Sequence, residues 1–341
     1  MKKILIINTL VTDDQYAVVM GIISVMGTAV SLFGLVSNAM IIRTFTAMGV
    51  DDGMSVSFLF LSISELVCFL MAIGQEVSIA FWVVEIGSHY NIYSTVHPYV
   101  FVNFFGNARN CLFDVPVLIT LYLAVAKCMC VVKPLHFKNM FSVSRSVWVT
   151  VGICIFSVGS YVPIFANTGV TWEFDKNINR TRPMLWASPY RDVIKNIIWT
   201  VRDSVPCLAS QVIIVICIYF MSRTLLEAAK FRGSLVAAST SRRNAESYDN
   251  NNQGMKRPNL KETQIIQQVV LISAVYIVGN TPKIVIFLAF ILVPGLTLNT
   301  PYQNVYLIII NIRELIEMIT SSVNIFIYYK YNSKFRSHCK C

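Results

Sequence analysis

Charged side chains within long apolar stretches are the residues whose chemistry stands out in this 341-residue chain. A charge in a membrane-spanning helix costs roughly 2.5–3.5 kcal/mol on insertion scales, so such a residue usually has a pairing or binding role. Eight such residues are expected to form a layer inside the helix bundle, and this layer predicts either a ligand site or a set of internal ion pairs. Six members are expected at a similar depth and two nearer the middle of their helices: Arg109, Arg202, Asp203, Lys283, Arg313 and Glu314, then Asp114 and Glu317.

The layer contains four basic and four acidic side chains, so it can be neutral. Buried opposite charges can pair with one another and join helices without any ligand. The two interpretations are compatible if a ligand anion displaces one acid from its base, for instance Glu314 from Arg109. Tyr276 and Tyr306 would then line the apolar remainder of the pocket.

Hydropathy predicts the helices that carry these charges. Hydrophobic residues make up 55% of the chain and charged residues 13%, with a mean hydropathy of +0.60, whereas soluble domains have about 25% charged residues. About 20 apolar residues are enough to cross a bilayer. Seven stretches qualify: 16–45, 54–82, 100–131, 147–165, 193–221, 264–293 and 305–329. The sequence predicts an all-α membrane protein, a seven-helix bundle over 16–330 with tails at 1–15 and 331–341.

The distribution of basic residues predicts the orientation. Lys and Arg collect in short cytoplasmic loops, and most of them fall on the side that holds the C-terminus. The glycosylation sequon that starts at Asn179 lies in the loop 167–192 on the opposite side. We therefore expect an extracellular N-terminus, a cytoplasmic C-terminus and a multi-pass plasma-membrane protein. The net charge of +10 then reflects attraction to the anionic inner leaflet, with no nucleic-acid partner.

Catalytic and metal-binding patterns are not visible in the sequence. No nucleophile–base–acid set, Gly-rich phosphate loop or His pair occurs at a recognisable spacing, so we predict neither an enzyme nor a cofactor. Most cysteines fall in apolar stretches, where a thiol is usually a small packing residue. Cys339 and Cys341, beside basic residues of the tail, are candidates for palmitoylation or else free thiols.

Short motifs follow one another along the chain in a recognisable order. They are Ser37-Asn38, 61–66 with Glu65, Ala126-Lys127-Cys128 eight residues before Pro134, Tyr276 to Pro282, Asn324 to Tyr328, and Phe335. Their order resembles that of the rhodopsin-like G-protein-coupled receptors over nearly the whole chain after Tyr16. Within that family, the stretch from Cys111 to Leu135 looks most like invertebrate chemosensory receptors of gastropod type.

The resemblance implies an extracellular ligand bound in the outer half of the bundle and a heterotrimeric G-protein activated on the cytoplasmic side. The residues that match the activation motifs are Asn38, Glu65, Lys127, Pro134, Pro282, Asn324 and Tyr328. Pro282 would be the hinge of the sixth helix, and Lys127 and Tyr328 would contact the G-protein. A short amphipathic helix containing Phe335 would follow the last span.

Two departures from the family pattern carry consequences. Ala126 stands where the family has an acid that restrains the next residue, so we predict raised basal activity that Ala126→Asp lowers. Lys127 also lacks the planar fork of the family's Arg. The usual disulfide to the loop 167–192 is missing, because Val102 stands at the expected position. We expect the loop to fold over the pocket by packing of Trp172 and Trp186.

The resemblance also bears on the ligand. Arg109 lies eighteen residues before Lys127, where amine-binding members of the family carry an Asp. A cation there argues against a protonated amine and favours a carboxylate or another anion. We therefore predict ligand contacts by Arg109, Lys283, Arg313, Glu314 and Tyr276.

Two alternatives remain beside a chemosensory receptor for a small polar or anionic molecule. A neuropeptide receptor could use the same basic residues to bind a peptide carboxylate, and ligand size would separate the two. A membrane transporter also places charges in its spans. Transporters usually show an internal repeat and broken helices in matching positions, and this sequence shows neither.

Overall fold

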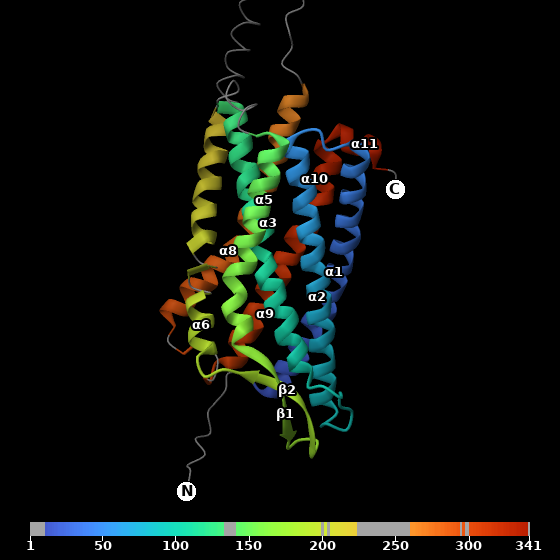
Figure 1. The fold of residues 1–341 in the computed structure, drawn as a ribbon, viewed down its shortest axis with the longest axis vertical. Coiled ribbons are helices and arrows are strands. Elements are labelled where there is room, and N and C mark those ends of the chain that lie inside the picture. The colour runs from blue at the N-terminus through green and yellow to red at the C-terminus, as the bar shows by residue number, and fades with distance from the viewer. Residues whose placement is uncertain are drawn as a thin grey trace, which may run out of the picture.

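The computed structural model describes residues 11–132, 141–198, 201–202, 205–223, 260–293, 295–296 and 300–339. Long helices run side by side along the molecule (Figure 1). The elements are α1 Asp13–Met48, α2 Gly53–Gly87, α3 Pro98–Val132, α5 Val143–Ala166, strands β1 Thr168–Asp175 and β2 Arg180–Ala187, α6 Arg191–Ile198, the helix Val205–Arg223, α8 Leu260–Leu292, α9 Gln303–Ser322, α10 Asn324–Tyr331 and α11 Ser333–His338. We call the end at which β1 and β2 lie the hairpin end, and the other the α11 end.

Six described helices are long and apolar enough to cross a membrane. They are α1, α2 and α5 over their full lengths, the residues Pro98–Cys130 of α3 and Val270–Ala289 of α8, and the helix Val205–Arg223. The architecture is therefore that of a helical, multi-pass membrane protein. The expected seventh span, 305–329, falls on α9 and α10, which meet at Val323. Three charged residues lie within α9, and its crossing of the membrane stays a prediction.

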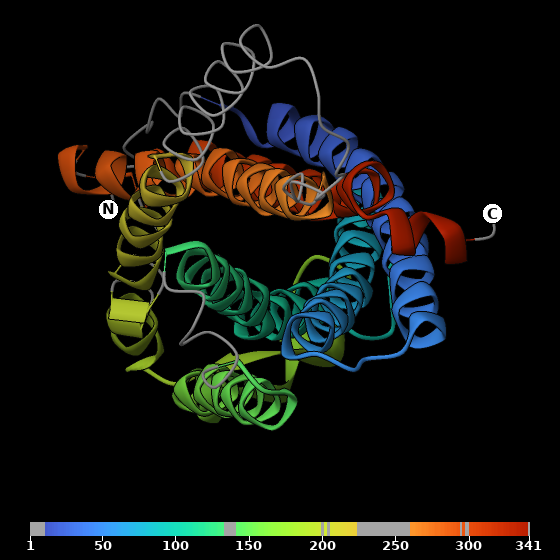
Figure 2. The same ribbon diagram turned by 90° about the horizontal axis from the view of Figure 1, so that it is seen from above.

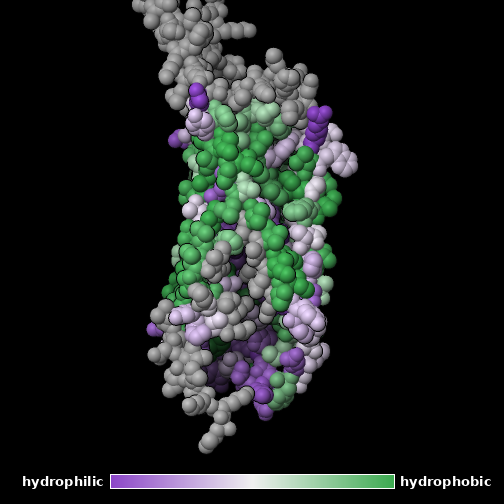
Figure 3. Space-filling model, turned by 90° about the vertical axis from the view of Figure 1, so that its left-hand side faces the viewer, coloured by the Kyte–Doolittle hydropathy of each residue, from purple (hydrophilic) through white to green (hydrophobic). Residues whose placement is uncertain are grey.

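The lateral surface of the bundle is apolar. On α5, Trp148 is 72% exposed and Ile155 68% exposed. Figure 3 shows hydrophobic side chains over the middle of one face, with hydrophilic ones gathered toward the hairpin end. Apolar surface of this extent suits contact with lipid hydrocarbon rather than water.

A row of small residues lets α1 approach α2 closely. Ser24, Gly27, Ser31, Gly34 and Ser37 recur every three or four positions and are buried. A Cβ atom on Gly34 would lie 2.3 Å from the ring of Phe69 on α2. Small residues at such intervals allow the close backbone contacts on which helix packing in membranes depends. The two helices are in contact, and the end-on view shows them as neighbours (Figure 2).

An aromatic cluster closes the α11 end of the bundle. Tyr328 and Phe335 are fully buried, with ring centroids 5.5 and 5.6 Å from that of Phe45. Asn332 caps α11 by accepting a hydrogen bond from the backbone N–H of Phe335. The expected short helix after the last span is thus present as α11. Ala126 of α3 is also fully buried in this cluster.

The loop 167–192 forms an antiparallel hairpin, in which Thr168 pairs with Ala187 and Asp175 with Arg180. The expected packing of its two tryptophans over a pocket is wrong. Trp172 is 72% exposed and Trp186 is 44% exposed. Backbone pairing orders the loop, and a buried arginine described below attaches it to the bundle.

Candidate functional site

An ion-pair network joins α2, α3 and α9 inside the bundle. Nη1 of Arg109 lies 2.5 Å from Oε2 of Glu314, and Nη2 donates to the Glu314 carbonyl oxygen at 3.3 Å. Nη2 also lies 3.7 Å from Oε2 of Glu317. Gln75 of α2 donates to Oε2 of Glu314 at 2.9 Å. All three charged side chains are buried.

Arg313 completes the network from α9 itself. Its guanidinium lies 3.6 Å from Oε1 of Glu314 and 3.6 Å from Oε1 of Glu317. These two arginines and two glutamates, which with Gln75 we call the Arg109 network, balance in charge. Internal pairing, one of the two interpretations drawn from the sequence, is therefore present here.

A second buried ion pair joins Asp114 of α3 to Arg202, which lies in the chain between α6 and the helix Val205–Arg223. Nε of Arg202 lies 2.7 Å from Oδ2 of Asp114, and Nη2 donates to the Cys111 carbonyl oxygen at 2.8 Å. The Arg202 guanidinium also lies 4.4 Å from the ring centroid of Tyr161. Asp203, expected in the same layer, lies outside the described residues.

Two predicted ligand residues, Lys283 and Tyr276, contact side chains outside the Arg109 network. The ammonium of Lys283 lies 5.5 Å from the ring centroid of Phe113. The Tyr276 hydroxyl is hydrogen-bonded to that of Ser210 at 2.8 Å. Tyr276 lines a cavity of about 40 Å³ in the middle of the bundle, together with Glu65 and with Glu317 of the Arg109 network. Arg109 and Arg313 therefore both contact Glu314, and Tyr276 shares a cavity with the network through Glu317.

A larger cavity, of about 120 Å³, lies between the hairpin end and the Arg109 network. We call it the hairpin-end cavity. Among its lining residues are four aromatic side chains, five amides, one acid and one base: Tyr16, Trp82, Tyr99 and Tyr306; Gln75, Asn103, Asn107, Asn110 and Asn311; Glu314; and Lys195. Glu314 thus faces this cavity, as does Tyr306. Arg109 instead lines a smaller cavity of about 20 Å³, together with Glu65 and Glu317.

The predicted activation residues are mostly buried. Asn324 of α10 donates to Oε1 of Glu65 on α2 at 2.8 Å. Asn38 donates to the Gly34 carbonyl oxygen at 3.0 Å. Tyr328 is enclosed in the aromatic cluster, so contact with a partner would require it to move.

The remaining predicted positions lie at ends and turns. Lys127 is half-buried near the end of α3, and Pro282 lies inside α8. Asn179 is exposed at the hairpin turn, with a φ of 53°. Cys339 is half-buried beside the aromatic cluster, whereas Pro134 and Cys341 lie outside the described residues.

Sequence reasoning missed the attachment of the hairpin. Arg182 of β2 is buried, and its Nη2 lies 2.5 Å from both Oε1 of Glu85 and Oδ2 of Asp175. Its Nη1 donates to the Ser94 carbonyl oxygen at 3.2 Å. The backbone N–H of His97 also donates a hydrogen bond to the Pro183 carbonyl oxygen of β2 at 3.0 Å. We call Glu85, His97, Asp175 and Arg182 the hairpin anchor.

The charges of the hairpin anchor shift the pKa values of Asp175 and His97. Burial raises the pKa of the Asp175 carboxyl, but the Asn177 N–H and the Arg182 guanidinium outweigh burial, so this pKa lies below its ordinary value. Burial and the Arg182 charge together lower the pKa of His97. His97 is therefore neutral when the hairpin is attached at neutral pH.

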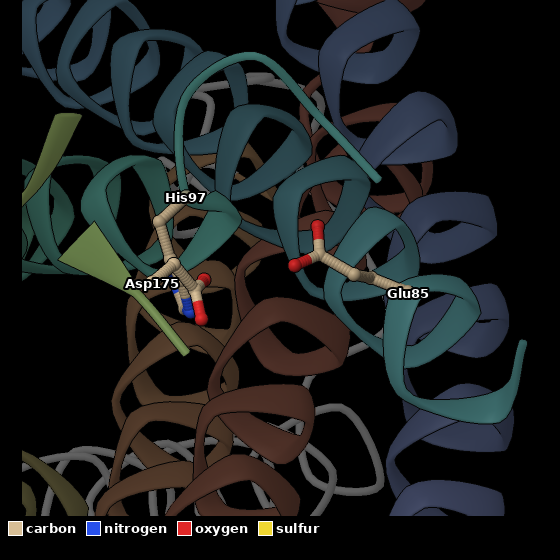
Figure 4. A group of neighbouring side chains, drawn as sticks. All are labelled: Glu85, His97 and Asp175. Atoms are coloured by element: carbon tan, nitrogen blue, oxygen red, sulfur yellow. The ribbon is translucent and has the colours of Figure 1, made fainter. Parts of the chain in front are cut away.

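Three residues of the hairpin anchor, Glu85, His97 and Asp175, are of types that often bind metal ions. Ligand atoms of Glu85, His97 and Asp175 lie within 4.8 Å of one another (Figure 4). However, Arg182 already binds both carboxylates, and Nδ1 of His97 accepts a hydrogen bond from the Tyr99 N–H at 3.2 Å. The anchor is thus closed by a protein cation, and we assign no metal to it.

The chain matches no known family model and none of the curated proteins with which it was compared. Fold and site together define a class: a multi-pass α-helical membrane protein with buried ion pairs and a polar cavity near one end.

Proposed function

We propose that the chain is a rhodopsin-like G-protein-coupled receptor of the plasma membrane that binds a small extracellular molecule. The ligand enters the hairpin-end cavity, which faces outside, and a heterotrimeric G-protein binds at the α11 end. The contact of this cavity with the Arg109 network is the observation that carries the proposal. A ligand at Glu314 touches a charged cluster to which α2, α3 and α9 all contribute.

Such a ligand acts by favouring one arrangement of these helices over another. A ligand shifts a conformational equilibrium only by its difference in affinity for the two states. The proposed active state opens the α11 end by an outward swing of α8 near Pro282. The polar pair between Glu65 and Asn324 lies between the cavity and that end, where it would respond to the change.

The size of the cavity favours a small molecule over a neuropeptide. At about 120 Å³, it is below the range of roughly 300–1,000 Å³ typical of sites for drug-sized ligands. A chemosensory ligand of few heavy atoms fits this volume.

Basal G-protein dissociation in cells expressing the chain tests the proposal. The missing acid at Ala126 predicts measurable basal output, which Ala126→Asp should lower by pairing with Lys127. Because Ala126 is fully buried among apolar side chains, Ala126→Asn is the matched control: it adds a similar polar group without the charge. Equal output from both variants at equal surface expression, or no output from the wild type with any ligand, would contradict the proposal.

A further inference from the structure

Glu314 is the charged group that a ligand meets at the inner end of the hairpin-end cavity. Its Oε2 is occupied by Arg109 and Gln75. Its Oε1 lies 3.6 Å from Arg313, which is longer than a hydrogen bond. A carboxylate can accept about four hydrogen bonds, so Glu314 has capacity for a further donor from the cavity side.

The cavity wall nearer the hairpin end consists of aromatic rings in edge-to-face and tilted contact. The ring centroids of Tyr16 and Trp82 are 6.1 Å apart, and those of Trp82 and Tyr99 are 5.7 Å apart. Trp82 follows Gln75, the hydrogen-bond partner of Glu314, by seven residues on α2, which is about 10 Å along a helix. Aromatic faces attract cations and apolar groups alike.

We propose that the hairpin-end cavity binds a small organic ammonium ion, with its charged end on Glu314 and its apolar body against Tyr16, Trp82 and Tyr99. This inference rests on the proposed function for the direction of entry but concerns only binding. It differs from the anion expected from Arg109, because Glu314 lies between Arg109 and the cavity. Lys195, the one base among the lining residues, disfavours an ammonium on the side of α6.

Binding of an ammonium ion at Glu314 also bears on Arg109. The ligand and Arg109 share the charge of one carboxylate, so the ligand weakens the attraction between Arg109 and Glu314, and Arg109 already lies 3.7 Å from Glu317. Glu317 follows Glu314 by one turn, toward the α11 end. The ligand therefore shifts Arg109 from Glu314 toward Glu317 and moves a buried charge further into the bundle.

Thermal stabilisation of the purified full-length chain measures binding without any G-protein. The probes are 2-phenylethylamine and longer arylalkyl amines, each beside the alcohol and the carboxylate of the same carbon skeleton. The amines should stabilise the protein, and the alcohols and carboxylates should not. Stabilisation by the carboxylates alone would instead support Arg109 as an anion anchor, and no stabilisation by any amine would overturn the proposal.

Two double variants separate the role of Glu314 from loss of folding. Arg109→Gln with Glu314→Gln removes one buried base and one acid, so no charge is left unpaired, and amine affinity should fall at least tenfold. Arg109→Gln with Glu317→Gln removes the same charges but retains Glu314, and it should keep amine binding. Equal affinities in the two variants would refute the assignment. Binding without G-protein dissociation would refute the receptor function while leaving the ligand class intact.

Discussion

Replacement of Arg182 by methionine should detach the hairpin from the bundle. The guanidinium makes two hydrogen bonds to Asp175, at 2.8 and 2.5 Å, one to Glu85 at 2.5 Å and one to Ser94 at 3.2 Å. Methionine fills a similar volume but leaves two buried carboxylates without a counter-charge. Breaking a buried ion pair in this way costs roughly 3–5 kcal/mol.

That cost predicts a large change in hairpin opening. At about 1.4 kcal/mol for each factor of ten, the open state should become roughly 100- to 4,000-fold more populated. A two-stranded hairpin is only marginally stable by itself, so an open hairpin loses its backbone protection. Hydrogen exchange of the β1 and β2 amides, measured with the protein in lipid nanodiscs, reports this population.

Arg180→Met is the matched control for this experiment. Arg180 lies on the same strand but is exposed, with its guanidinium 5.5 Å from the ring centroid of Tyr93. Loss of an exposed side chain usually changes stability by at most about 0.5 kcal/mol. Adding Glu85→Gln and Asp175→Asn to Arg182→Met should recover part of the protection. Equal exchange in Arg182→Met and Arg180→Met would refute the buried-charge argument.

Two other changes test separate parts of the fold. Because the pKa of His97 is lowered in the attached state, the open state takes up a proton first as pH falls. The hairpin is therefore fully attached above pH 6.5, and its attachment weakens as the pH falls below 6.5. Hydrogen exchange of the hairpin amides, corrected for intrinsic rates, should increase over the same pH range. His97→Asn should abolish this pH dependence. Gly34→Ala places a Cβ 2.3 Å from Phe69 and should cost about 1–3 kcal/mol by overpacking. Thermal unfolding in detergent should show a lower midpoint than for Gly152→Ala, where a Cβ meets nothing within 4 Å.

Apolar length predicted most of the fold from the sequence. The stretches 16–45 and 54–82 lie within α1 and α2, which extend up to five residues further at an end. The starts of α1 and α2 were missed because the polar N-caps Thr12 and Asp52 begin each helix before its apolar part. Hydropathy also could not predict that the stretch 305–329 divides between α9 and α10 at Val323.

Charge spacing predicted the buried layer but not the way its members pair. Arg109 and Glu314 are 205 positions apart in the chain, and their contact depends on the rotation of α3 and α9 about their axes. That rotation is set by packing along the whole helix. Arg182 was missed for a related reason: an arginine in a polar loop is usually exposed, and only the tertiary contact with α2 buries it.

The hairpin anchor and the hairpin-end cavity share their supporting backbone. Glu85 follows Trp82 by three residues on α2, and the N–H of Tyr99 donates to His97 at the start of α3. Trp82 and Tyr99 are in turn ring neighbours on the cavity wall. A loosened anchor therefore frees the ends of α2 and α3 that hold these two rings, and a less ordered wall binds a ligand less tightly. Arg182, which is not among the residues that line the cavity, should for this reason affect ligand affinity as well as hairpin opening. A covalent disulfide at the same end would hold the wall at every pH, whereas an anchor of ion pairs and a neutral histidine makes its order depend on acidity.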